Sequence, residues 1–208
     1  MAGAEGIVYV VDDDESVRKA LARLIRSVGL DVEPFPAARS FLDHPLPDRP
    51  SCLVLDVRLP GASGLDLQAE LSRARPDLPI IFVTGHGDVP MSVRAMKGGA
   101  IDFLQKPFSD QDLLDSIHRA IARSREALAV RAARAAIQRR LGTLTPRERE
   151  VLALVVTGIL NKQIAARLGT SEKTVKIHRG RVMQKMQADS VAELVRLAEK
   201  VGLPSQGK

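Results

Sequence analysis

Cys52-Leu53-Val54-Leu55-Asp56-Val57-Arg58-Leu59-Pro60 is the stretch of sequence on which the rest of the chain depends. Its apolar part, residues 52–55, is short and unbroken, as is typical of a strand buried on both faces of a sheet. Asp56 then stands at the carboxyl end of the strand, where ligands bind in open α/β sheets. A single aspartate at a strand end more often caps a helix or a turn, so the neighbouring strands decide between these roles.

Four other strand patterns accompany this one, and helix patterns separate them. The strands are expected at residues 7–11, 31–35, 53–56, 80–84 and 101–105, with helices at residues 15–28, 37–43, 65–74 and 89–97. Regular alternation of strands and helices is typical of a parallel sheet with helices on both faces. For five strands, the usual arrangement is a doubly wound α/β fold with the strand order 2-1-3-4-5.

Distinct chemical groups stand at the ends of four of these strands. They are Asp12 and Asp13, Asp56, Thr84, and Lys106. Three converging carboxylates repel one another, which predicts a hard divalent cation, and Mg²⁺ fits because it takes only one or two carboxylates. Asp56 would then accept a phosphoryl group whose oxygens face Lys106 and the Thr84 hydroxyl. Each residue alone has an ordinary explanation as a turn, a solvated lysine or a helix start, but together they indicate a phosphoryl site.

The motifs around these strand ends resemble the receiver domains of response regulators, and within them the FixJ subgroup. The matching stretches are VDDD at residues 11–14, LDVRLPG at 55–61, TGHGDVP at 84–90 and FLQKPF at 103–108. The resemblance implies that a sensor histidine kinase phosphorylates Asp56.

The same resemblance implies further roles. It gives Mg²⁺ ligands at Asp13, Asp56 and the main-chain carbonyl of Arg58, with Asp12 close by. It also implies a switch pair, Thr84 and Phe103, in which the hydroxyl moves onto the phosphoryl group and the ring turns inward. His86 lies between glycines in the third motif and is interpreted as a surface loop residue.

Charged and aromatic residues are distributed unevenly along the chain, whose net charge is +6. Residues 1–108 carry 12 Lys/Arg against 15 Asp/Glu, a net of −3, residues 109–141 carry 7 against 4, a net of +3, and residues 142–208 carry 12 against 6, a net of +6. An acidic front and a basic back indicate different partners. Every aromatic residue precedes Ser109. The basic end therefore has no rings for stacking unpaired bases, which favours duplex DNA over RNA or single strands.

The sequence carries no sign of a membrane or secretory location. It contains no apolar run of about 18 residues, and its N-terminus lacks the basic and apolar segments of a secretory signal. Because Cys52 is the single cysteine, an internal disulfide or a site with several cysteine ligands is excluded, and a buried, inert thiol is expected. We therefore expect a cytoplasmic protein.

Residues 109–141 contain neither glycine nor proline and are rich in arginine, alanine and leucine, which predicts a long helix. An alternating three-and-four spacing, typical of a coiled-coil seam, links Leu114, Ile117, Ile121, Ser124 and Leu128. That spacing covers only two heptads. The favoured alternative packs the first half of the helix on the sheet and makes the second half a spacer.

The last third of the chain has the proportions of a helix-turn-helix domain. A capping box at residues 145–148 opens one helix, Asn161 is expected to cap the next at residues 162–168, and a third spans residues 171–187. A tight turn at Gly169 separates the last two, as in a helix-turn-helix, and a fourth helix follows.

The third of these helices has an apolar face and a cationic face. Val175, Val182 and Met186 mark the buried side, and the opposite side carries Lys173, Lys176, Ile177, Gly180, Arg181 and Gln184. A cationic face without acids is the form of a helix that enters the major groove, although most basic faces are only solvated. Ile177 favours the DNA interpretation, because an exposed apolar group can contact a thymine methyl.

This region resembles the LuxR/FixJ-type DNA-binding domain through LTPREREVL at residues 144–152, NKQIA at 161–165 and TVKIH at 174–178. The resemblance implies base contacts from Lys176 and Ile177. The complete set of expected DNA-contacting residues is Asn161, Lys162, Lys173, Thr174, Lys176, Ile177, Arg179 and Arg181. Gly180 departs from the family pattern, which often has a basic residue there, so Arg179 or Arg181 is expected to contact phosphate instead.

These observations predict three segments: a receiver domain at residues 5–122, a helical linker at 123–141 and a LuxR-type helix-turn-helix domain at 142–204. The predicted function is transcriptional regulation, in which a phosphoryl group on Asp56 shifts an equilibrium toward an active state. Dimerisation through residues 89–121 would then pair two DNA-binding domains on a two-fold related site. The expected partners are a sensor histidine kinase, double-stranded promoter DNA, RNA polymerase and a second phosphorylated copy of the chain.

Two other classes of function are open to such a sequence. One is a Mg²⁺-dependent phosphohydrolase with Asp56 as its nucleophile, but such enzymes usually carry a second acid two residues later, where this chain has Arg58. Only self-phosphorylation and slow hydrolysis of the aspartyl phosphate are expected. The other is a scaffold that acts through protein contacts alone, which the basic face of Lys173, Lys176 and Arg181 disfavours.

Overall fold

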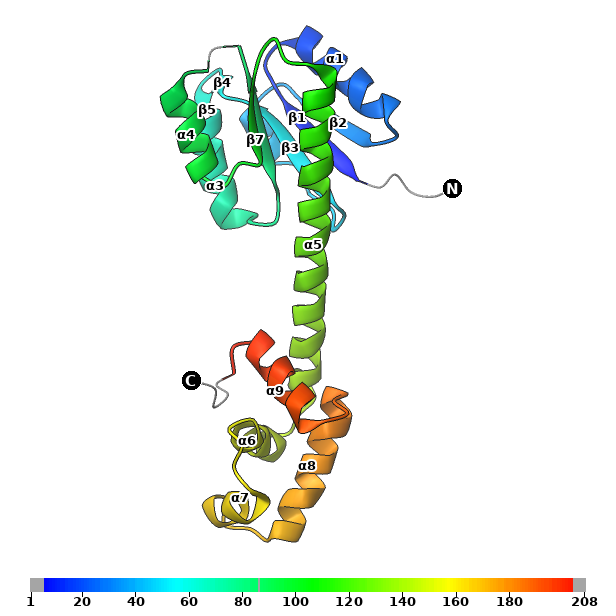
Figure 1. Cartoon of the computed structure of the whole chain (residues 1–208), viewed down its shortest axis with the longest axis vertical. Helices are drawn as coiled ribbons and strands as arrows, with labels where there is room; N and C mark the ends of the chain where they lie inside the picture. Colours follow the sequence, from blue (N-terminus) through cyan, green and yellow to red (C-terminus); the bar gives the residue numbers. More distant parts are fainter. Residues whose placement is uncertain (1–5, 86, 204–208) are drawn as a thin grey trace. The chain divides into compact units, whose positions relative to one another are not determined.

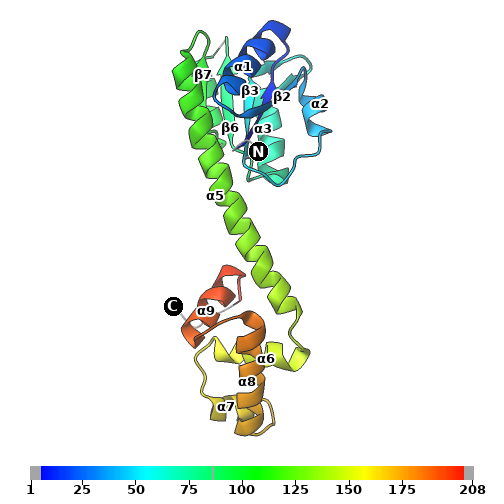
Figure 2. The ribbon, with the colours of Figure 1, turned by 90° about the vertical axis from the view of Figure 1, so that its right-hand side faces the viewer.

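The computed structural model describes residues 6–85 and 87–203, and its internal contacts divide the chain into two compact units, Met1–Ala129 and Val130–Lys208. Figures 1 and 2 between them label the elements of both units. His86, expected on a surface loop, lies outside the described residues, as do residues 5 and 204 at the outer limits of the predicted domains. Each unit is described by itself below.

A five-stranded parallel sheet forms the centre of the first unit. Its strands are β1 (Ile7–Val11), β2 (Asp31–Phe35), β3 (Ser51–Asp56), β6 (Ile80–Thr84) and β7 (Asp102–Gln105). They follow the order β2-β1-β3-β6-β7, which confirms the predicted doubly wound order 2-1-3-4-5. The central strand, β3, pairs with β1 on one side and with β6 on the other, and every one of its residues is buried.

Helices cover both faces of this sheet. They are α1 (Glu15–Ser27), α2 (Ala38–Leu42), α3 (Gly64–Ala74), α4 (Val89–Lys97) and the first part of α5 (Asp110–Gly142). Figures 1 and 2 show α1 and α5 on one face, with α2 and α3 on the other. Side chains alternate along β3, so that Leu53 and Leu55 pack toward α2, α3 and α4, while Cys52 and Val54 pack toward α1 and α5. Each fully buried leucine or valine contributes about 1.5–3 kcal/mol.

The turn after Asp56 contains a short hairpin that the sequence does not predict. It consists of β4 (Arg58–Leu59) and β5 (Ala62–Ser63), which pair antiparallel to each other. Gly61 joins them with a φ of 75°, a left-handed conformation that glycine adopts without a Cβ clash. The hairpin fixes the backbone that immediately follows the candidate acceptor.

The long helix α5 combines a packed part and an exposed part. Leu113, Ile117 and Ile121 are buried in the core of the sheet unit, as the packing interpretation predicts. Ser124 is buried as well, and its Oγ accepts a hydrogen bond of 3.1 Å from the backbone N–H of Ser51. Residues 129–135 are exposed at every position, and Ile137 is buried again, in the core of the second unit. No helix among the described residues has both the length and the apolar character that a membrane crossing requires.

The second unit is helical and is built around one apolar core. Its complete helices are α6 (Pro146–Val155), α7 (Asn161–Arg167), α8 (Glu172–Met186) and α9 (Val191–Lys200). Val175, Val182 and Met186 of α8 are fully buried, as predicted. Gly169 has a φ of 60° between α7 and α8 and forms the expected tight turn of a helix-turn-helix.

Two capping predictions for this unit have different outcomes. The capping box is confirmed, since Thr145 accepts from the N–H of Glu148 and Glu148 accepts from the N–H of Thr145. The prediction that Asn161 caps α7 is wrong. Leu160 occupies the N-cap position, and its N–H donates to the Gln163 side chain at 3.2 Å. The side chain that accepts this backbone N–H at the start of α7 therefore comes from the first turn of the helix.

Candidate functional site

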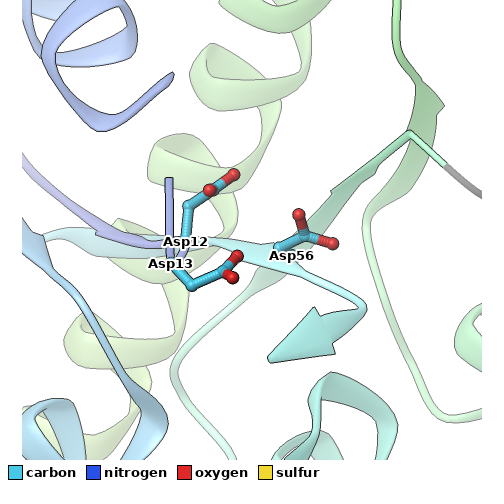
Figure 3. A group of neighbouring side chains, drawn as sticks. All are labelled: Asp12, Asp13 and Asp56. Carbon is cyan, nitrogen blue, oxygen red and sulfur yellow. The ribbon is translucent and has the colours of Figure 1, made fainter. Parts of the chain in front are cut away.

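Three carboxylates meet at the carboxyl edge of the sheet. The register pairs Val11 of β1 with Leu55 of β3, so the next residues, Asp12 and Asp56, end neighbouring strands side by side. Asp13 follows Asp12, and Figure 3 shows all three side chains directed toward a common space. One carboxylate oxygen from each lies within 4.8 Å of the others. Asp12 and Asp56 are buried, whereas Asp13 is exposed and gives the cluster a solvent-facing side.

Lys106 completes this cluster from the end of β7. Its Nζ donates to Asp12 Oδ2 at 2.7 Å and lies 3.3 Å from Asp56 Oδ2. Burial acts to lower the pKa of Lys106, but its hydrogen bond to Asp12 and the charges of Asp12 and Asp56 outweigh burial and raise the pKa. The lysine is therefore a permanent cation at neutral pH. A single positive charge faces three carboxylates, which leaves the cluster with an excess of negative charge.

The carboxylate cluster has the donor set that a hard divalent cation prefers. Mg²⁺ binds oxygens at about 2.1 Å, so opposite ligands lie about 4.2 Å apart, close to the spread of these three carboxylates. The remaining oxygen of Asp56, Oδ1, accepts the backbone N–H of Arg58 at 3.0 Å, which keeps the Arg58 backbone beside the cluster. The residues present fit a Mg²⁺ site of the kind typical of receiver domains.

Thr84 and Phe103, the predicted switch pair, lie on either side of a glycine. Thr84 ends β6 and is buried, and the Phe103 ring on β7 is half-buried against Phe82, with ring centroids 6.1 Å apart. A Cβ added to Gly87 would lie 2.8 Å from the Phe103 ring and 3.2 Å from the Thr84 methyl group. The absence of a side chain at Gly87 therefore leaves room for both the Thr84 methyl group and the Phe103 ring.

Sequence reasoning missed two residues of this site. One is Gly87, whose close contacts depend on a neighbouring strand and leave no local signal. The other is Arg18 of α1, whose Nη1 donates to the main-chain carbonyl of Asp12 at 2.7 Å. That bond fixes the backbone that carries the first carboxylate. Arg18 stands six residues after Asp12 on the first helix, and its charge alone gives no indication of this contact.

The second unit presents a basic face on α8. Lys173, Lys176, Ile177 and Arg181 are all exposed, and half of the Ile177 surface is open to solvent. Lys176 has an acidic neighbour on the helix, Glu172, but the two charged atoms lie 3.7 Å apart and both side chains are largely exposed. Such a pair contributes little, so Lys176 remains available to an anionic ligand.

Three of the other four predicted DNA-contacting residues, Asn161, Thr174 and Arg179, make contacts within this unit. Arg179 is half-buried, and its Nη1 donates to Asn161 Oδ1 at 3.1 Å, which joins α8 to the start of α7. Thr174 Oγ1 and Ser171 Oγ lie 2.8 Å apart at the start of α8. Lys162 is exposed on the first turn of α7. Asn161 and Arg179 thus have a structural partner in each other.

An ion pair with a buried carboxylate joins α6 to α8. Glu148 is 2% exposed, and its Oε2 accepts from Lys185 Nζ at 2.7 Å. The hydrogen bond from Lys185, with the backbone bond from Thr145, lowers the pKa of Glu148 to about 2. Lys185 also donates to the carbonyl of Thr143 at 3.1 Å, so one ammonium joins α8 to both sides of the turn before α6.

Comparison with protein families accounts for both units. Residues 8–118 match the response regulator receiver domain, and residues 142–198 match the bacterial regulatory proteins of the luxR family. The chain belongs to the FixJ/NarL-type response regulators. Members of this type join a receiver to a LuxR-type DNA-binding domain, which is the order of the two units here.

Similar proteins share this arrangement over nearly their whole length. The chain is 55% identical to Nodulation protein W of Bradyrhizobium diazoefficiens over 97% of this chain and 89% of that protein. It is 45% identical to the transcriptional regulatory protein FixJ of Azorhizobium caulinodans over 94% of this chain and 93% of that protein. The solved structure of the response regulator StyR matches with a TM-score of 0.83 and 49% identity, over 95% of this chain and 100% of that one. This FixJ/NarL-type response regulator is therefore a phosphorylation-dependent transcriptional regulator.

Proposed function

We propose that Asp56 accepts a phosphoryl group from a sensor histidine kinase and that this modification controls binding of promoter DNA through α8. The observation that carries the proposal is the presence, in one chain, of a carboxylate cluster faced by Lys106 and of an exposed basic helix in a LuxR-type domain. The proposed segments are the receiver at residues 5–122, the linker at 123–141 and the DNA-binding domain at 142–204.

In the acceptor reaction, an oxygen of Asp56 attacks phosphorus as the bond from phosphorus to the histidine nitrogen of the kinase breaks. Mg²⁺, held by Asp12, Asp13, Asp56 and the main-chain carbonyl of Arg58, would offset the charge that develops on the phosphoryl oxygens. Lys106, already 3.3 Å from Asp56 Oδ2, is in reach of one of those oxygens. The same groups support self-phosphorylation from a small phosphodonor and slow hydrolysis of the aspartyl phosphate.

Phosphorylation of Asp56 would then affect residues that lie between the carboxylate cluster and the exposed side of α4. A phosphoryl group carries nearly two negative charges, and it attracts Lys106 and the hydroxyl of Thr84. Thr84 and the Phe103 ring both border Gly87, so a movement of the hydroxyl changes the space available to the ring. Phe103 lies on β7, which contacts α4, and α4 exposes three large apolar side chains, those of Val89, Val93 and Met96.

Dimerisation through the face formed by α4, β7 and α5 is the proposed output of this movement. The exposed apolar side chains of α4 are suited to pair with their own copies across a two-fold axis. A dimer would bring two α8 helices to two half-sites of promoter DNA, where RNA polymerase is the further partner. We place this action in the cytoplasm, where promoter DNA is available.

The test combines labelling, sizing and DNA binding in the full-length protein. Acetyl phosphate with Mg²⁺ should label the wild type, convert it from monomer to dimer on a sizing column, and tighten its binding to duplexes that it selects from a random-sequence pool. Asp56→Asn should lose all three responses, because its amide cannot form the acyl phosphate. Asp66→Asn, at an exposed acid of α3, is the control and should keep them. Labelling of the Asp56→Asn variant would contradict the role of Asp56 as acceptor. Labelling of the wild type without a change in its mobility on the column would contradict the dimer step.

A further inference from the structure

Asp13 is the carboxylate of the cluster whose position depends most on the backbone. Asp12 and Asp56 are buried, and hydrogen bonds to their side-chain oxygens hold both of them in place. The Asp13 side chain is exposed, and no donor among the described residues holds its carboxylate. The orientation of the two peptide groups that flank Asp13 therefore decides where its oxygens lie.

A hydrogen bond restrains each of these two peptide groups. The group after Asp13 includes the N–H of Asp14, which donates to Asp12 Oδ1 at 2.9 Å. The group before Asp13 includes the carbonyl of Asp12, which accepts from Arg18 Nη1 at 2.7 Å. Because β1 ends at Val11, this carbonyl lies beyond the strand, and a side chain supplies its donor. Arg18 thus restrains the peptide group that joins Asp12 to Asp13.

The place of Arg18 on α1 is unfavourable for a cation. Arg18 is the fourth residue of the helix, and the N-terminal end of a helix carries a partial positive charge. The side chain is also half-buried, which removes part of its solvation. A contact must offset these costs, and the bond to the Asp12 carbonyl is the hydrogen bond that the Arg18 side chain makes.

We propose that Arg18 is a positioning residue for Asp13, and that its bond to the Asp12 carbonyl makes the carboxylate cluster selective for Mg²⁺ over Ca²⁺. The proposal rests on the proposed Mg²⁺ site of this cluster. Mg²⁺ requires near-ideal octahedral geometry with oxygens at about 2.1 Å, whereas Ca²⁺ accepts flexible geometry at about 2.3–2.6 Å. A ligand held in place favours the smaller ion, so release of Asp13 should weaken the binding of Mg²⁺ more than that of Ca²⁺.

The charge of Arg18 and its hydrogen bond have opposite effects on metal binding. A cation beside the cluster repels a metal ion, so removal of the charge alone should tighten the binding of any divalent cation. Removal of the bond frees the peptide group before Asp13, and loss of a partner that orients a metal ligand weakens binding by about 10–100-fold. The sign of the change therefore distinguishes a positioning residue from a charge that lies nearby.

The experiment measures metal affinity in the unphosphorylated full-length protein. Urea unfolding of the receiver is followed by the fluorescence of Tyr9, which lies on β1, at a series of Mg²⁺ or Ca²⁺ concentrations. The rise in stability with metal concentration gives the dissociation constant, and the stability without metal is measured in the same series. Arg18→Met should raise the dissociation constant for Mg²⁺ about ten-fold and that for Ca²⁺ only about two-fold.

Two further arginine variants test the role of the bond. Arg18→Lys keeps the charge and an N–H donor, and it should recover part of the Mg²⁺ affinity that Arg18→Met loses. Arg23→Met removes the same charge from an exposed position of the same helix. It should leave both dissociation constants within about two-fold of the wild type, because solvent screens an exposed charge.

Asp13→Asn separates this inference from the proposed Mg²⁺ site. If Asp13→Asn binds Mg²⁺ as tightly as the wild type, the cluster is not the site and both proposals are overturned. If Asp13→Asn weakens binding while Arg18→Met leaves it unchanged or tightens it, Arg18 has no positioning role and the Mg²⁺ site stands. Equal weakening of Mg²⁺ and Ca²⁺ binding in Arg18→Met, or no recovery in Arg18→Lys, would also overturn the inference.

Discussion

Lys106 Nζ lies 2.7 Å from a carboxylate oxygen of Asp12, a residue that is 1% exposed, whereas Lys176 Nζ lies 3.7 Å from a carboxylate of Glu172 with both side chains in solvent. The same ammonium group is thus held by the carboxylate cluster of the receiver and left in solvent on α8. In the carboxylate cluster, the register of β1, β3 and β7 with their neighbouring strands determines which carboxylates lie beside Lys106. On α8, only the helix itself arranges the charges.

This difference reflects the ligand that each region receives. A phosphoryl group is small and reacts at one atom, so its surroundings must be arranged in advance. A DNA duplex offers many phosphates, and exposed lysines adjust to them while they release counterions. We therefore expect single substitutions in the carboxylate cluster to alter stability and chemistry together, and substitutions of the exposed cations of α8 to alter affinity alone.

The largest effect on stability is expected from Lys106→Met. It removes the cation that faces Asp12 and Asp56 and should lower the free energy of unfolding of the receiver by about 2–3 kcal/mol in metal-free buffer at neutral pH. Mg²⁺ should restore much of the loss, since it neutralises the same carboxylates. Urea unfolding followed by the fluorescence of Tyr9 measures this in the receiver alone, because Tyr9 is the only tyrosine and the chain has no tryptophan.

Lys97→Met provides the matched comparison, because Lys97 is exposed at the end of α4. Its effect on stability should stay within about 0.5 kcal/mol. Equal stability of the two variants would mean that Lys106 is not held as tightly as its contacts indicate, and the contrast with α8 would be lost.

Lys176→Ala should have a smaller effect, confined to DNA binding. Loss of one contact should weaken binding about ten-fold and reduce the slope of log affinity against log salt by about 1 if the ammonium lies against phosphate. The unfolding temperature should hardly change, because the exposed pair of Lys176 with Glu172 contributes little. Gel-shift titrations at several salt concentrations measure this, with Lys200→Ala in α9 as the control. A loss of stability in Lys176→Ala would break the comparison.

Glu148→Gln tests whether a buried carboxylate outside the receiver also stabilises its unit through a close ion pair, as Asp12 does with Lys106. Its partner Lys185 lowers the pKa of Glu148 from an ordinary 4.5 to about 2. The pair therefore stabilises the helical unit fully above about pH 4.5, and this stabilisation is lost as the pH falls toward 2. Thermal unfolding by circular dichroism should show a shallower acid dependence in Glu148→Gln than in the wild type.

Glu15→Gln is the control for that measurement. Its hydrogen bond and ion pair with Lys19 also lower the pKa of Glu15, but both side chains are largely exposed. Screening by solvent should leave the acid dependence of the Glu15→Gln variant close to that of the wild type. An equal change in both variants would remove the distinction between buried and exposed pairs.

The sequence predicted the sheet order and the convergence of Asp12, Asp56 and Lys106, because both follow from where buried strands end. It did not predict the hairpin of β4 and β5, since strands of two residues have no periodicity. The cap of α7 was assigned to Asn161 because asparagine is a common capping residue, while the bond that forms uses Gln163 within the helix.

Contacts that depend on the folded backbone account for the other features that sequence reasoning did not find. Lys185 lies 37 residues after Glu148, and Arg18 bonds to a backbone carbonyl whose position depends on the β1 strand. Neither partner is marked by residue type or spacing. The neighbours of Gly87 likewise become visible only in three dimensions.

The exposed stretch of α5 at residues 129–135 has an evolutionary consequence. Because no side chain there enters a core, residues can be inserted, deleted or exchanged in it without opening a cavity in either unit. We expect such a segment to tolerate recombination that joins a receiver to a different effector. The helix-forming tendency of alanine and arginine suits such a junction, because it keeps the segment helical without a core to pack against.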